Sequence, residues 1–376
     1  MNNEYVNHEI ENWKMYLAAV SCRVEYLKHG HRKMGKGPIC MIVGENTSRL
    51  NWFPVEKKDG YAYSVLGDDG VIIVDYEEEC EHLIIPSRID GKRVLAVGRI
   101  MWKESVKKVT VEEGILQLCY GFLESCENLE TVELPANLVR IAGEFCMGSR
   151  KIREFIVNGQ NGSITAENGV LYDCSKRILL RYPAAGPDKI FRIPDKVRFI
   201  CERAFGGCSL EKIIVPDGME VIGRHAFMGG AAEVILPDSL TRIEKQAFWG
   251  CCLKKIEIPN SVTYMGERAF AYCTSLKEKK MPVWLEEFGT WMFQECDSLE
   301  KVWLPAGIRR LEGTFHECRA LKHVYIPPTV MEIDDTALNR DDKEFLTGAT
   351  IYGVEGSMAY YFAHDNGFQW IDVNEL

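Results

Sequence analysis

Short stretches of alternating apolar and polar residues recur along the chain, each ending at a proline. LEKVWLP at 299–305 and LKHVYIP at 321–327 are two of them. Alternation over four to six residues is typical of a short β-strand with one buried face. Proline ends such a strand, because it has no N–H to donate to a neighbouring strand. The pattern therefore predicts a series of short strands, each followed by a turn at proline.

The prolines that follow these stretches are evenly spaced, with steps of 22, 21, 22, 23, 23 and 22 residues. They are Pro194, Pro216, Pro237, Pro259, Pro282, Pro305 and Pro327. A series of phenylalanines keeps the same interval: Phe205, Phe227, Phe248, Phe270, Phe293 and Phe315. A constant period in the low twenties is the mark of a solenoid of stacked coils. The sequence therefore predicts a repeat array with a period of about 22 residues.

The phrase ERAF occurs in ERAFGGC at 202–208 and again in ERAFAYC at 267–273, three periods apart. Because the surrounding sequence repeats at this interval, the phrase belongs to the architecture rather than to a catalytic site. We expect its Ala-Phe step to lie on a tight helical turn, where the small alanine lets neighbouring coils approach. We expect its Glu-Arg couple to be a solvated ion pair.

Several of the 14 cysteines follow the repeat phenylalanines by three residues, namely Cys208, Cys251, Cys273, Cys296 and Cys318. Disulfide frameworks belong mainly to short secreted chains. We therefore interpret these cysteines as reduced, buried, small apolar side chains. Zinc sites need four converging ligands, and histidines and acidic residues do not recur beside the cysteines. The sequence predicts no metal site.

The strand stretches assign an inward or outward direction to each position. The positions one and three residues before each proline are apolar and are predicted to face inward: Ile213, Val215, Val234, Leu236, Ile256, Ile258, Val302, Leu304, Val324 and Ile326. Lys279 occupies such an inward position and predicts a locally irregular turn. The position four before proline carries alternating charges, with Lys212, Glu233, Lys255, Glu278 and Lys301. In a parallel ladder these residues are adjacent, so we expect ion pairs between coils.

A second outward position, two residues before proline, carries large apolar residues where water is expected. Local packing is one interpretation. The other is a partner surface, since Trp and Tyr often anchor protein interfaces. We expect Ile214, Ile235, Trp303 and Tyr325 to align along one sheet face. We expect Trp291 and Tyr264 to lie on nearby loops. The candidate partner surface comprises Ile214, Ile235, Trp303, Tyr325, Trp291 and Tyr264.

The repeat, Leu-x-x-Ile-x-Ile-Pro-x-x-Val-x-x-Ile-Gly-x-x-Ala-Phe-x-x-Cys, resembles the BspA-like class of bacterial leucine-rich repeats over roughly 83–345. The resemblance implies an α/β-type repeat solenoid. Its coil would be a right-handed leucine-rich-repeat coil of short parallel strands and tight helical turns. It also implies a protein-binding role, frequently at the bacterial surface or in adhesion.

The same resemblance divides the chain into three segments. Residues 61–345 form the solenoid, and GVLYDCSKRILLRYPAAG at 169–186 resembles the family's hairpin insertion, which we place near 158–186. Residues 346–376 resemble its closing cap. Residues 1–60 resemble no family that we can name, and their polar-apolar pattern predicts a partly helical segment of unknown type.

Charge and hydropathy exclude two classes of partner. The net charge of −10 argues against a general nucleic-acid binder, because neutralising phosphates requires a basic surface. Because the sequence has no run of 18 apolar residues, it predicts no membrane insertion. The N-terminus lacks the basic and apolar regions of a secretory signal. We therefore expect a cytoplasmic protein, with the cell surface as the alternative that the family resemblance implies.

Motifs for catalysis or cofactor binding are incomplete. GHRKMGKG at 30–37 nearly matches a phosphate loop, but Gly37 replaces the hydroxyl residue that would hold magnesium. Asp334, Asp335, Asp341 and Asp342 lack the spacing of a calcium loop. The sequence therefore predicts no catalytic residue and no cofactor.

These observations favour a non-enzymatic scaffold that binds a protein partner of unknown identity through its repeats. Homodimerisation through the same surface is an alternative. Two further alternatives are open: a nucleotide-responsive or enzymatic N-terminal segment with the solenoid as its targeting arm, and a carbohydrate-binding or adhesion module that uses the aromatic residues.

Overall fold

The computed structural model describes residues 40–42, 55–66, 70–100, 102–159, 162–341, 344–345 and 348–375. The chain forms two compact units: unit 1 comprises residues 1–176 and 180–186, and unit 2 comprises residues 177–179 and 187–376. Each unit is built from short β-strands. The phosphate-loop-like segment at 30–37 lies outside the described residues.

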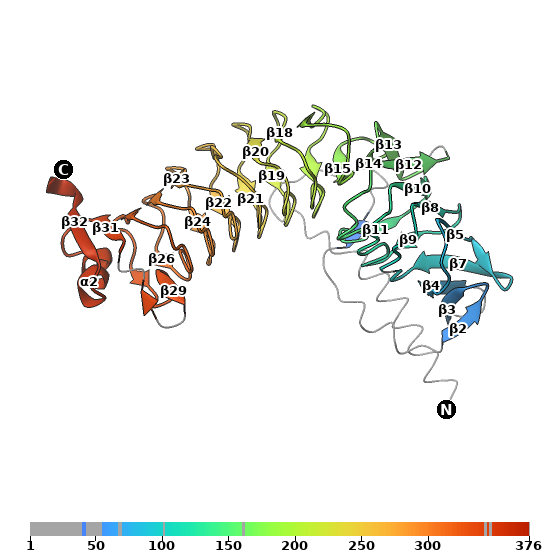
Figure 1. The fold of residues 1–376 in the computed structure, drawn as a ribbon. Helices are drawn as coiled ribbons and strands as arrows, with labels where there is room; N and C mark the ends of the chain where they lie inside the picture. The colour runs from blue at the N-terminus through green and yellow to red at the C-terminus, as the bar shows by residue number, and fades with distance from the viewer. Residues whose placement is uncertain are drawn as a thin grey trace, which may run out of the picture. The chain divides into compact units, whose positions relative to one another are not determined.

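Unit 1 contains two sheets and a hairpin (Figure 1). One sheet has the order β1-β11-β9-β7-β4-β3-β2, and the other has the order β12-β10-β8-β5. An antiparallel hairpin, β13–β14, lies within the predicted insertion. The strands are β1 (Cys40–Ile42), β2 (Val55–Lys58), β3 (Tyr61–Leu66), β4 (Gly70–Tyr76), β5 (His82–Ile85), β6 (Arg88–Ile89), β7 (Lys92–Val97), β8 (Lys108–Val111), β9 (Gln117–Leu118), β10 (Thr131–Pro135), β11 (Arg140–Ala142), β12 (Glu154–Asn158), β13 (Ile164–Glu167) and β14 (Val170–Asp173).

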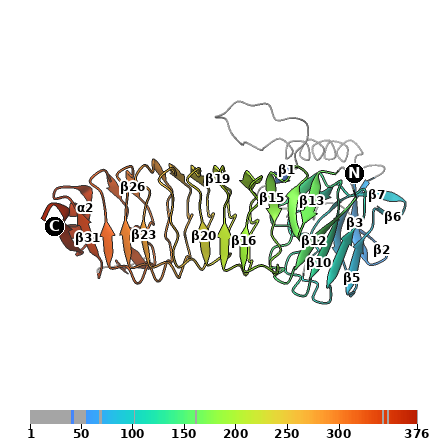
Figure 2. The same ribbon diagram turned by 90° about the horizontal axis from the view of Figure 1, so that it is seen from above.

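Unit 2 is a stack of coils, and most coils contribute two strands. The first strands form the parallel sheets β16-β18-β20 and β23-β25-β27-β31-β32, and Figure 2 shows them side by side. They are β16 (Ile190–Arg192), β18 (Lys212–Ile214), β20 (Glu233–Ile235), β23 (Glu278–Lys280), β25 (Lys301–Trp303), β27 (His323–Tyr325), β31 (Thr350–Gly353) and β32 (Gln369–Asp372).

The second strands of the coils form a second pair of parallel sheets, β17-β19-β21-β22-β24 and β26-β28. They are β17 (Phe199–Ile200), β19 (Val221–Ile222), β21 (Arg242–Ile243), β22 (Tyr264–Met265), β24 (Glu287–Phe288), β26 (Arg310–Leu311) and β28 (Glu332–Ile333). β15 (Ile178–Arg181) joins β17 through Ile178 and Leu179. β29 (Asn339–Asp341) and β30 (Glu344–Phe345) form a hairpin. The C-terminus carries α2 (Met358–Asp365) and a 3₁₀ turn, η2 (Val373–Glu375).

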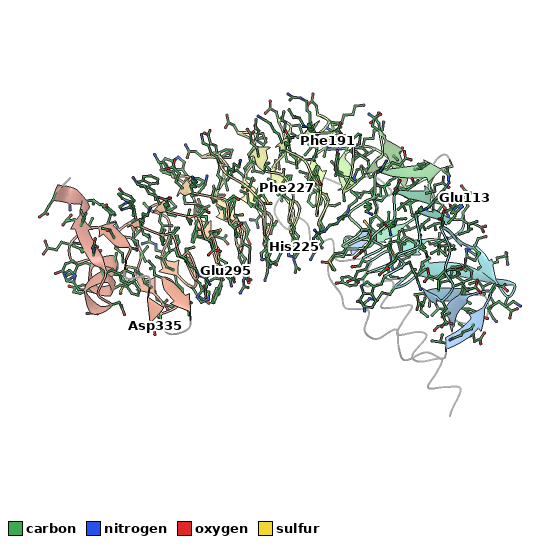
Figure 3. The ribbon with its side chains drawn as sticks, in the orientation of Figure 1. Glu113, Phe191, His225, Phe227, Glu295 and Asp335 are labelled. Carbon is green, nitrogen blue, oxygen red and sulfur yellow. The ribbon has the colours of Figure 1, made fainter. Side chains whose placement is uncertain are left out.

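The repeat phenylalanines form a continuous stack inside unit 2. Phe227 and Phe248 have ring centroids 5.1 Å apart with an interplanar angle of 4°, and Phe248 and Phe270 are 5.0 Å apart at 6°. Figure 3 shows Phe227 within its coil. All six phenylalanines of the series are fully buried. The repeat phenylalanines, two of which belong to the ERAF phrases, therefore supply one ring per coil to a shared core.

The turns that carry the Ala-Phe step are not helical, so the expected tight helical turns and the α/β class are wrong. The residue two before each phenylalanine has φ between 53° and 57°, at Arg203, His225, Gln246, Arg268 and Trp291. A left-handed residue interrupts a right-handed helix. The phenylalanine N–H donates to the next coil, as from Phe227 to the Ala247 carbonyl at 2.9 Å. Unit 2 is a β-solenoid, and α2 is the only α-helix among the described residues.

The repeat cysteines connect neighbouring coils through their thiols. The Sγ atoms of Cys273 and Cys296 donate to the carbonyls of Phe248 and Phe270 at 3.2 and 3.1 Å. Burial raises the pKa of the Cys296 thiol to about 12. Ser149, which replaces the repeat cysteine in unit 1, makes the equivalent bond to the Leu123 carbonyl at 2.6 Å. The cysteines whose side chains are described form no disulfides.

The ladder of first strands is interrupted at one coil. Lys255–Glu257 forms only an isolated bridge between Lys255 and Glu233, and the sheet resumes at β23. Elsewhere in unit 2 the residue before the repeat proline donates to the next coil, as from Val215 to Ile235 and from Leu304 to Tyr325, both at 3.0 Å. Among the described coils, the matching bonds from Leu236 and Ile258 are not formed. The predicted inward positions are buried except for these same two residues, which are half-exposed.

Lys279 lies beside this interruption. Lys279 lies on β23, which pairs in regular register with β25. The irregularity predicted for the coil of Lys279 is therefore found one coil earlier, at residues 255–257. Its buried ammonium group donates to the Ile256 carbonyl at 2.6 Å. Desolvation lowers the pKa of Lys279 to about 8, although the Glu257 carboxylate opposes this shift. The interruption is thus accompanied by a buried cation whose burial costs free energy.

Ion pairs between coils form less regularly than the charge alternation predicts. Lys212 and Glu233 form the expected pair at 2.9 Å. Lys255 instead pairs with Glu257 of its own coil at 2.6 Å, and the Lys301 ammonium lies 4.6 Å from the Trp303 ring centroid. The interruption at 255–257 removes the register that would align Lys255 with Glu278.

Replacing Phe270 with Ala tests the aromatic core. The ring is fully buried between Phe248 and Phe293, so Phe270→Ala is expected to lower the free energy of unfolding by roughly 3–5 kcal/mol, measured by chemical denaturation. Phe248→Ala should have a similar effect, because it occupies the equivalent position. A Phe270→Ala protein with unchanged stability would contradict the stacked core.

Thiol labelling tests the environment of the cysteines. Cys174 and Cys252 are exposed, whereas the repeat cysteines are buried and their pKa values are raised by burial. In the native protein iodoacetamide should label Cys174 and Cys252 quickly and leave Cys273, Cys296 and Cys318 unmodified, as read by peptide mass spectrometry. Denaturation without reductant should make all of them reactive. Disulfides among the repeat cysteines would contradict this account.

Replacing Lys279 with Met tests the buried ammonium through the pH dependence of stability. The folded pKa, about 8, lies below the unfolded value of 10.5. Between these values the unfolded state binds more protons, so parental stability should rise with pH relative to that of Lys279→Met. The relative gain should approach about 3 kcal/mol by pH 10.5 and be absent below pH 8. Parallel stability curves for the two proteins would show that Lys279 is not buried as a cation.

Candidate interaction surface

Three aromatic residues are neighbours on the outward side of the sheet β23-β25-β27-β31-β32. The strands are parallel and in register, so Trp303 pairs with Tyr325 and Tyr325 pairs with Tyr352. The alternation of each strand places Val302, Val324 and Ile351 in the core and the aromatic residues outside, where they are half-exposed. We call Trp303, Tyr325 and Tyr352 the aromatic strip.

The rings of the aromatic strip stack on one another. The centroids of Trp303 and Tyr325 are 5.2 Å apart with an interplanar angle of 14°, and those of Tyr325 and Tyr352 are 4.3 Å apart at 17°. The Tyr352 hydroxyl is 3.1 Å from Nδ1 of His323. Stacking covers the facing ring surfaces, so the strip presents mainly ring edges and hydroxyl groups to a partner.

Basic side chains lie at one end of the aromatic strip. Lys280 precedes Trp303 in the same outward row, because the two residues pair in the β23–β25 register. The Lys301 ammonium lies 4.6 Å from the Trp303 centroid and 5.6 Å from that of Tyr325. A cation near aromatic rings at these distances is attracted to them. The strip therefore combines apolar area with positive charge.

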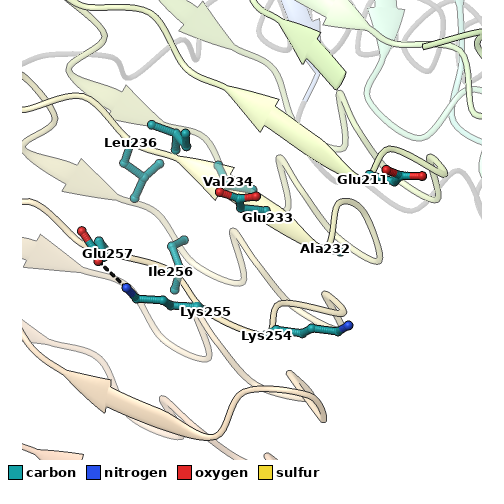
Figure 4. A pocket seen from close by; sticks show the side chains of 10 residues that line it. Glu211, Ala232, Glu233, Val234, Leu236, Lys254, Lys255, Ile256 and Glu257 are labelled. Atoms are coloured by element: carbon teal, nitrogen blue, oxygen red, sulfur yellow. Dashed lines mark ion pairs between the residues drawn. The ribbon is translucent and has the colours of Figure 1, made fainter. Parts of the chain in front are cut away.

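Ile214 and Ile235 do not belong to the aromatic strip. They pair with each other in the separate sheet β16-β18-β20, and the interruption at 255–257 lies between the two sheets. The expectation that all four outward residues share one sheet face is therefore wrong. Beside Ile235 is a groove of about 550 Å³, lined by β20, Leu236 and the Lys255–Glu257 ion pair (Figure 4).

Tyr264 and Trp291 occupy other parts of the coil. Tyr264 lies on β22 in the second-strand sheet, where the Arg242 guanidinium is 3.7 Å from its ring centroid. Trp291 occupies the left-handed turn position, between the Arg268 guanidinium at 5.2 Å and the His316 ring at 5.2 Å. Both rings are engaged in local contacts, and the structure does not bring them together with the strip.

Sequence reasoning missed Tyr352. It lies in the segment ATIYG at 349–353, which alternates like the other strands but is not followed by proline. The periodic proline aligns the outward positions of the other strands, and the family resemblance places residues 346–376 in the closing cap, so neither signal puts Tyr352 in this row. The alternation alone could have identified it, since Ile351 and Tyr352 occupy the same inward and outward positions as Val324 and Tyr325.

One hydrogen-bonded row in unit 1 contains the residue types of a hydrolase site. Nε2 of His82 is 2.8 Å from the Thr110 hydroxyl, and that hydroxyl donates to Glu133 at 2.8 Å. The hydrogen bond from Lys108 lowers the pKa of Glu133. In a catalytic triad the carboxylate orients the imidazole, whereas here it contacts the hydroxyl. The row is a set of cross-strand contacts on β5, β8 and β10.

Asp334, one of the aspartates near the C-terminal end, has a structural role. Oδ1 of Asp334 accepts hydrogen bonds from the Thr336 N–H at 3.1 Å, the Thr336 hydroxyl at 2.8 Å and the Gly313 N–H at 3.3 Å. These bonds hold a turn against the preceding coil. The Asp341 and Asp342 side chains lie outside the described part of the chain. No helix of the described residues is long and apolar enough to cross a membrane.

Comparisons with solved structures find bacterial repeat proteins of low sequence identity. The pneumococcal vaccine antigen PcpA is 15% identical, with 85% of this chain and 98% of that chain covered and a TM-score of 0.43. A leucine-rich repeat protein from Eubacterium ventriosum is 17% identical, with 81% and 92% covered and a TM-score of 0.45. One from Bacteroides ovatus is 17% identical, with 80% and 100% covered and a TM-score of 0.35. No curated protein matches the chain.

The family assignment comes from the repeats themselves. The model of the BspA type leucine rich repeat region matches in six copies, over residues 99–178, 189–232 and 230–343. These matches cover more than half of the chain and include the coils that carry the phenylalanine stack and the first two residues of the aromatic strip. The chain therefore belongs to the BspA-type leucine-rich repeat family.

Proposed function

We propose that this protein is a non-enzymatic scaffold that binds another protein through the aromatic strip. The observation that supports this most directly is the stack of Trp303, Tyr325 and Tyr352 on the outward side of a regular parallel sheet. The core of the coil is already filled by the inward residues of the same strands. Large aromatic side chains outside a complete core are typical of interaction surfaces.

The rigidity of the strip favours binding. The main chain of each strand is hydrogen-bonded in register to its neighbours, as from Leu304 to Tyr325 at 3.0 Å and from Ile326 to Tyr352 at 2.8 Å. Each ring is further held by the ring on the next strand. A partner therefore meets a surface whose side chains have little conformational freedom left to lose, which lowers the cost of association.

The ring geometry favours a protein partner over a carbohydrate. Sugar binding by aromatic residues uses the flat face of a ring, but neighbouring rings of the strip have centroids only 4.3 to 5.2 Å apart, so no sugar fits between them. The available edges and hydroxyl groups suit the mixed polar and apolar surface of a protein. The proposal holds for a partner in the cytoplasm or at the cell surface, because it requires only access to this sheet.

Replacing two residues of the aromatic strip tests the proposal. Proteins captured from the native cell by the parent should be compared with those captured by Trp303→Ser with Tyr325→Ser, and the enriched protein purified for a binding titration. We expect the double variant to bind it at least about tenfold more weakly, because removing interface aromatics commonly costs 2 kcal/mol or more. Circular dichroism should show a folded variant, since both side chains are outward.

The matched control is Ile214→Ser with Ile235→Ser, which removes outward apolar residues from the other sheet and should leave affinity unchanged. Sedimentation of the parent and both variants shows whether the protein self-associates. If the parent forms a dimer that the strip variant does not form, the partner is a second copy of the chain. A folded strip variant with parental affinity for every partner, including itself, would overturn the proposal.

A further inference from the structure

We infer that the aromatic strip binds an acidic segment of the partner, with carboxylates at the lysine end and an apolar side chain at the Tyr352 end. This inference rests on the proposed scaffold function and adds the chemistry of the partner. It comes from the distribution of unpaired charge around the strip, from the polarity of aromatic edges and from the spacing of the strands.

The lysines beside the strip form no close ion pair. Within the described residues, the ammonium groups of Lys277, Lys280 and Lys301 have no carboxylate oxygen within 4.0 Å, the limit for an ion pair. Lys277 and Lys280 are exposed, and Lys301 is half-exposed. Glu278 is the acidic residue of the same strand, but it pairs with none of them at that distance. Glu300 lies nearby and pairs with Lys322 at 2.9 Å, so the local balance is four positive charges to two negative charges.

Two lysines on or beside the sheet β16-β18-β20 do form ion pairs. There Lys189 pairs with Glu211 at 3.1 Å, and Lys212 pairs with Glu233 at 2.9 Å. Those lysines are neutralised within the protein, although the chain as a whole carries a net charge of −10. Arg192 on β16 is also exposed and makes no ion pair among the described residues, so unpaired positive charge is not confined to the strip. What distinguishes the strip is that its unpaired lysines lie beside aromatic rings. Their charge is complementary to an acidic ligand and would speed its association.

The edges of the aromatic rings also favour an acidic ligand. The face of an aromatic ring carries negative potential and its edge carries positive potential. Stacking within the strip covers faces and leaves edges, and the Lys301 ammonium lies near the rings at 4.6 and 5.6 Å. Carboxylate and carbonyl oxygens are therefore favoured there. Single-stranded nucleic acid is disfavoured despite the lysines, because bases bind by stacking on uncovered ring faces and Tyr325 is stacked on both sides.

The geometry sets the spacing between the charged and apolar parts of the ligand. Lys280, Trp303, Tyr325 and Tyr352 lie on four successive strands of one sheet. Three strand spacings amount to about 14 Å, or about four residues of an extended chain. Tyr352 is followed in the same row by Ile371, so the far end of the strip is apolar. The ligand should carry its carboxylates and its apolar anchor about four residues apart.

A labelled peptide tests the inference directly. The probe is a fluorescein-labelled synthetic peptide with three consecutive glutamates followed, four residues later, by two leucines. Fluorescence anisotropy with the full chain should show at least about tenfold tighter binding than for the same peptide with glutamines in place of glutamates. The difference should shrink as salt is raised from 20 to 200 mM, because screening weakens exposed charge interactions.

Charge reversal locates the site. Lys277→Glu with Lys280→Glu should weaken binding of the acidic peptide by about tenfold and leave the glutamine peptide unaffected. Neither lysine makes a described ion pair, so folding should be preserved. The matched control, Lys189→Glu with Lys212→Glu, reverses two charges on the other sheet and should leave peptide affinity unchanged. Trp303→Ser with Tyr325→Ser should weaken binding of both peptides.

The outcomes separate the inference from the proposed function. No preference for the acidic peptide, or equal loss with both lysine pairs, overturns the inference and leaves the scaffold function intact. Binding of polyglutamate or single-stranded DNA that is indifferent to Trp303→Ser with Tyr325→Ser would reveal a general anion patch and also overturn it. The scaffold function itself falls only if the strip variant keeps its affinity for the native partner.

Discussion

Main-chain hydrogen bonds between successive coils hold unit 2 together, and the other repeat contacts depend on their register. When Leu304 donates to Tyr325, every side chain of one strand lies beside its counterpart on the next. The same register aligns Phe248 with Phe270 in the core and directs the Cys273 thiol to the Phe248 carbonyl. No coil could satisfy these groups alone, which is why the repeat has to be an array.

The interruption at 255–257 shows what the register contributes. There Leu236 and Ile258 lose both their inter-coil bonds and their full burial, and Lys279 places an ammonium group inside the coil. The phenylalanine stack nevertheless continues through Phe248 and Phe270 at 5.0 Å. The phenylalanine core and the sheet of first strands therefore stabilise the array separately, because the sheet is interrupted here while the core is continuous. This interruption divides the outward face into an isoleucine part and an aromatic part.

The repeat period was readable from sequence because each coil must present the same residue types to its neighbours. Phe270 and Val302 were therefore assigned correctly to the core from spacing alone. The turn conformation was not readable, because Arg268 and Trp291 adopt left-handed φ values that their residue types do not favour. Two properties of the strip were also hidden from sequence: the membership of Tyr352, which has no following proline, and the break that separates Ile235 from Trp303.

Residue-resolved amide hydrogen exchange tests the ladder and its interruption most directly. Exchange reports the opening of individual hydrogen bonds, so protected and unprotected amides can be compared at equivalent repeat positions. The account predicts slow exchange at Val215, Met281, Leu304 and Ile326, whose N–H groups donate to the next coil, and fast exchange at Leu236 and Ile258. Uniform protection at all six amides, or fast exchange at Leu304 and Ile326 beside the aromatic strip, would contradict it.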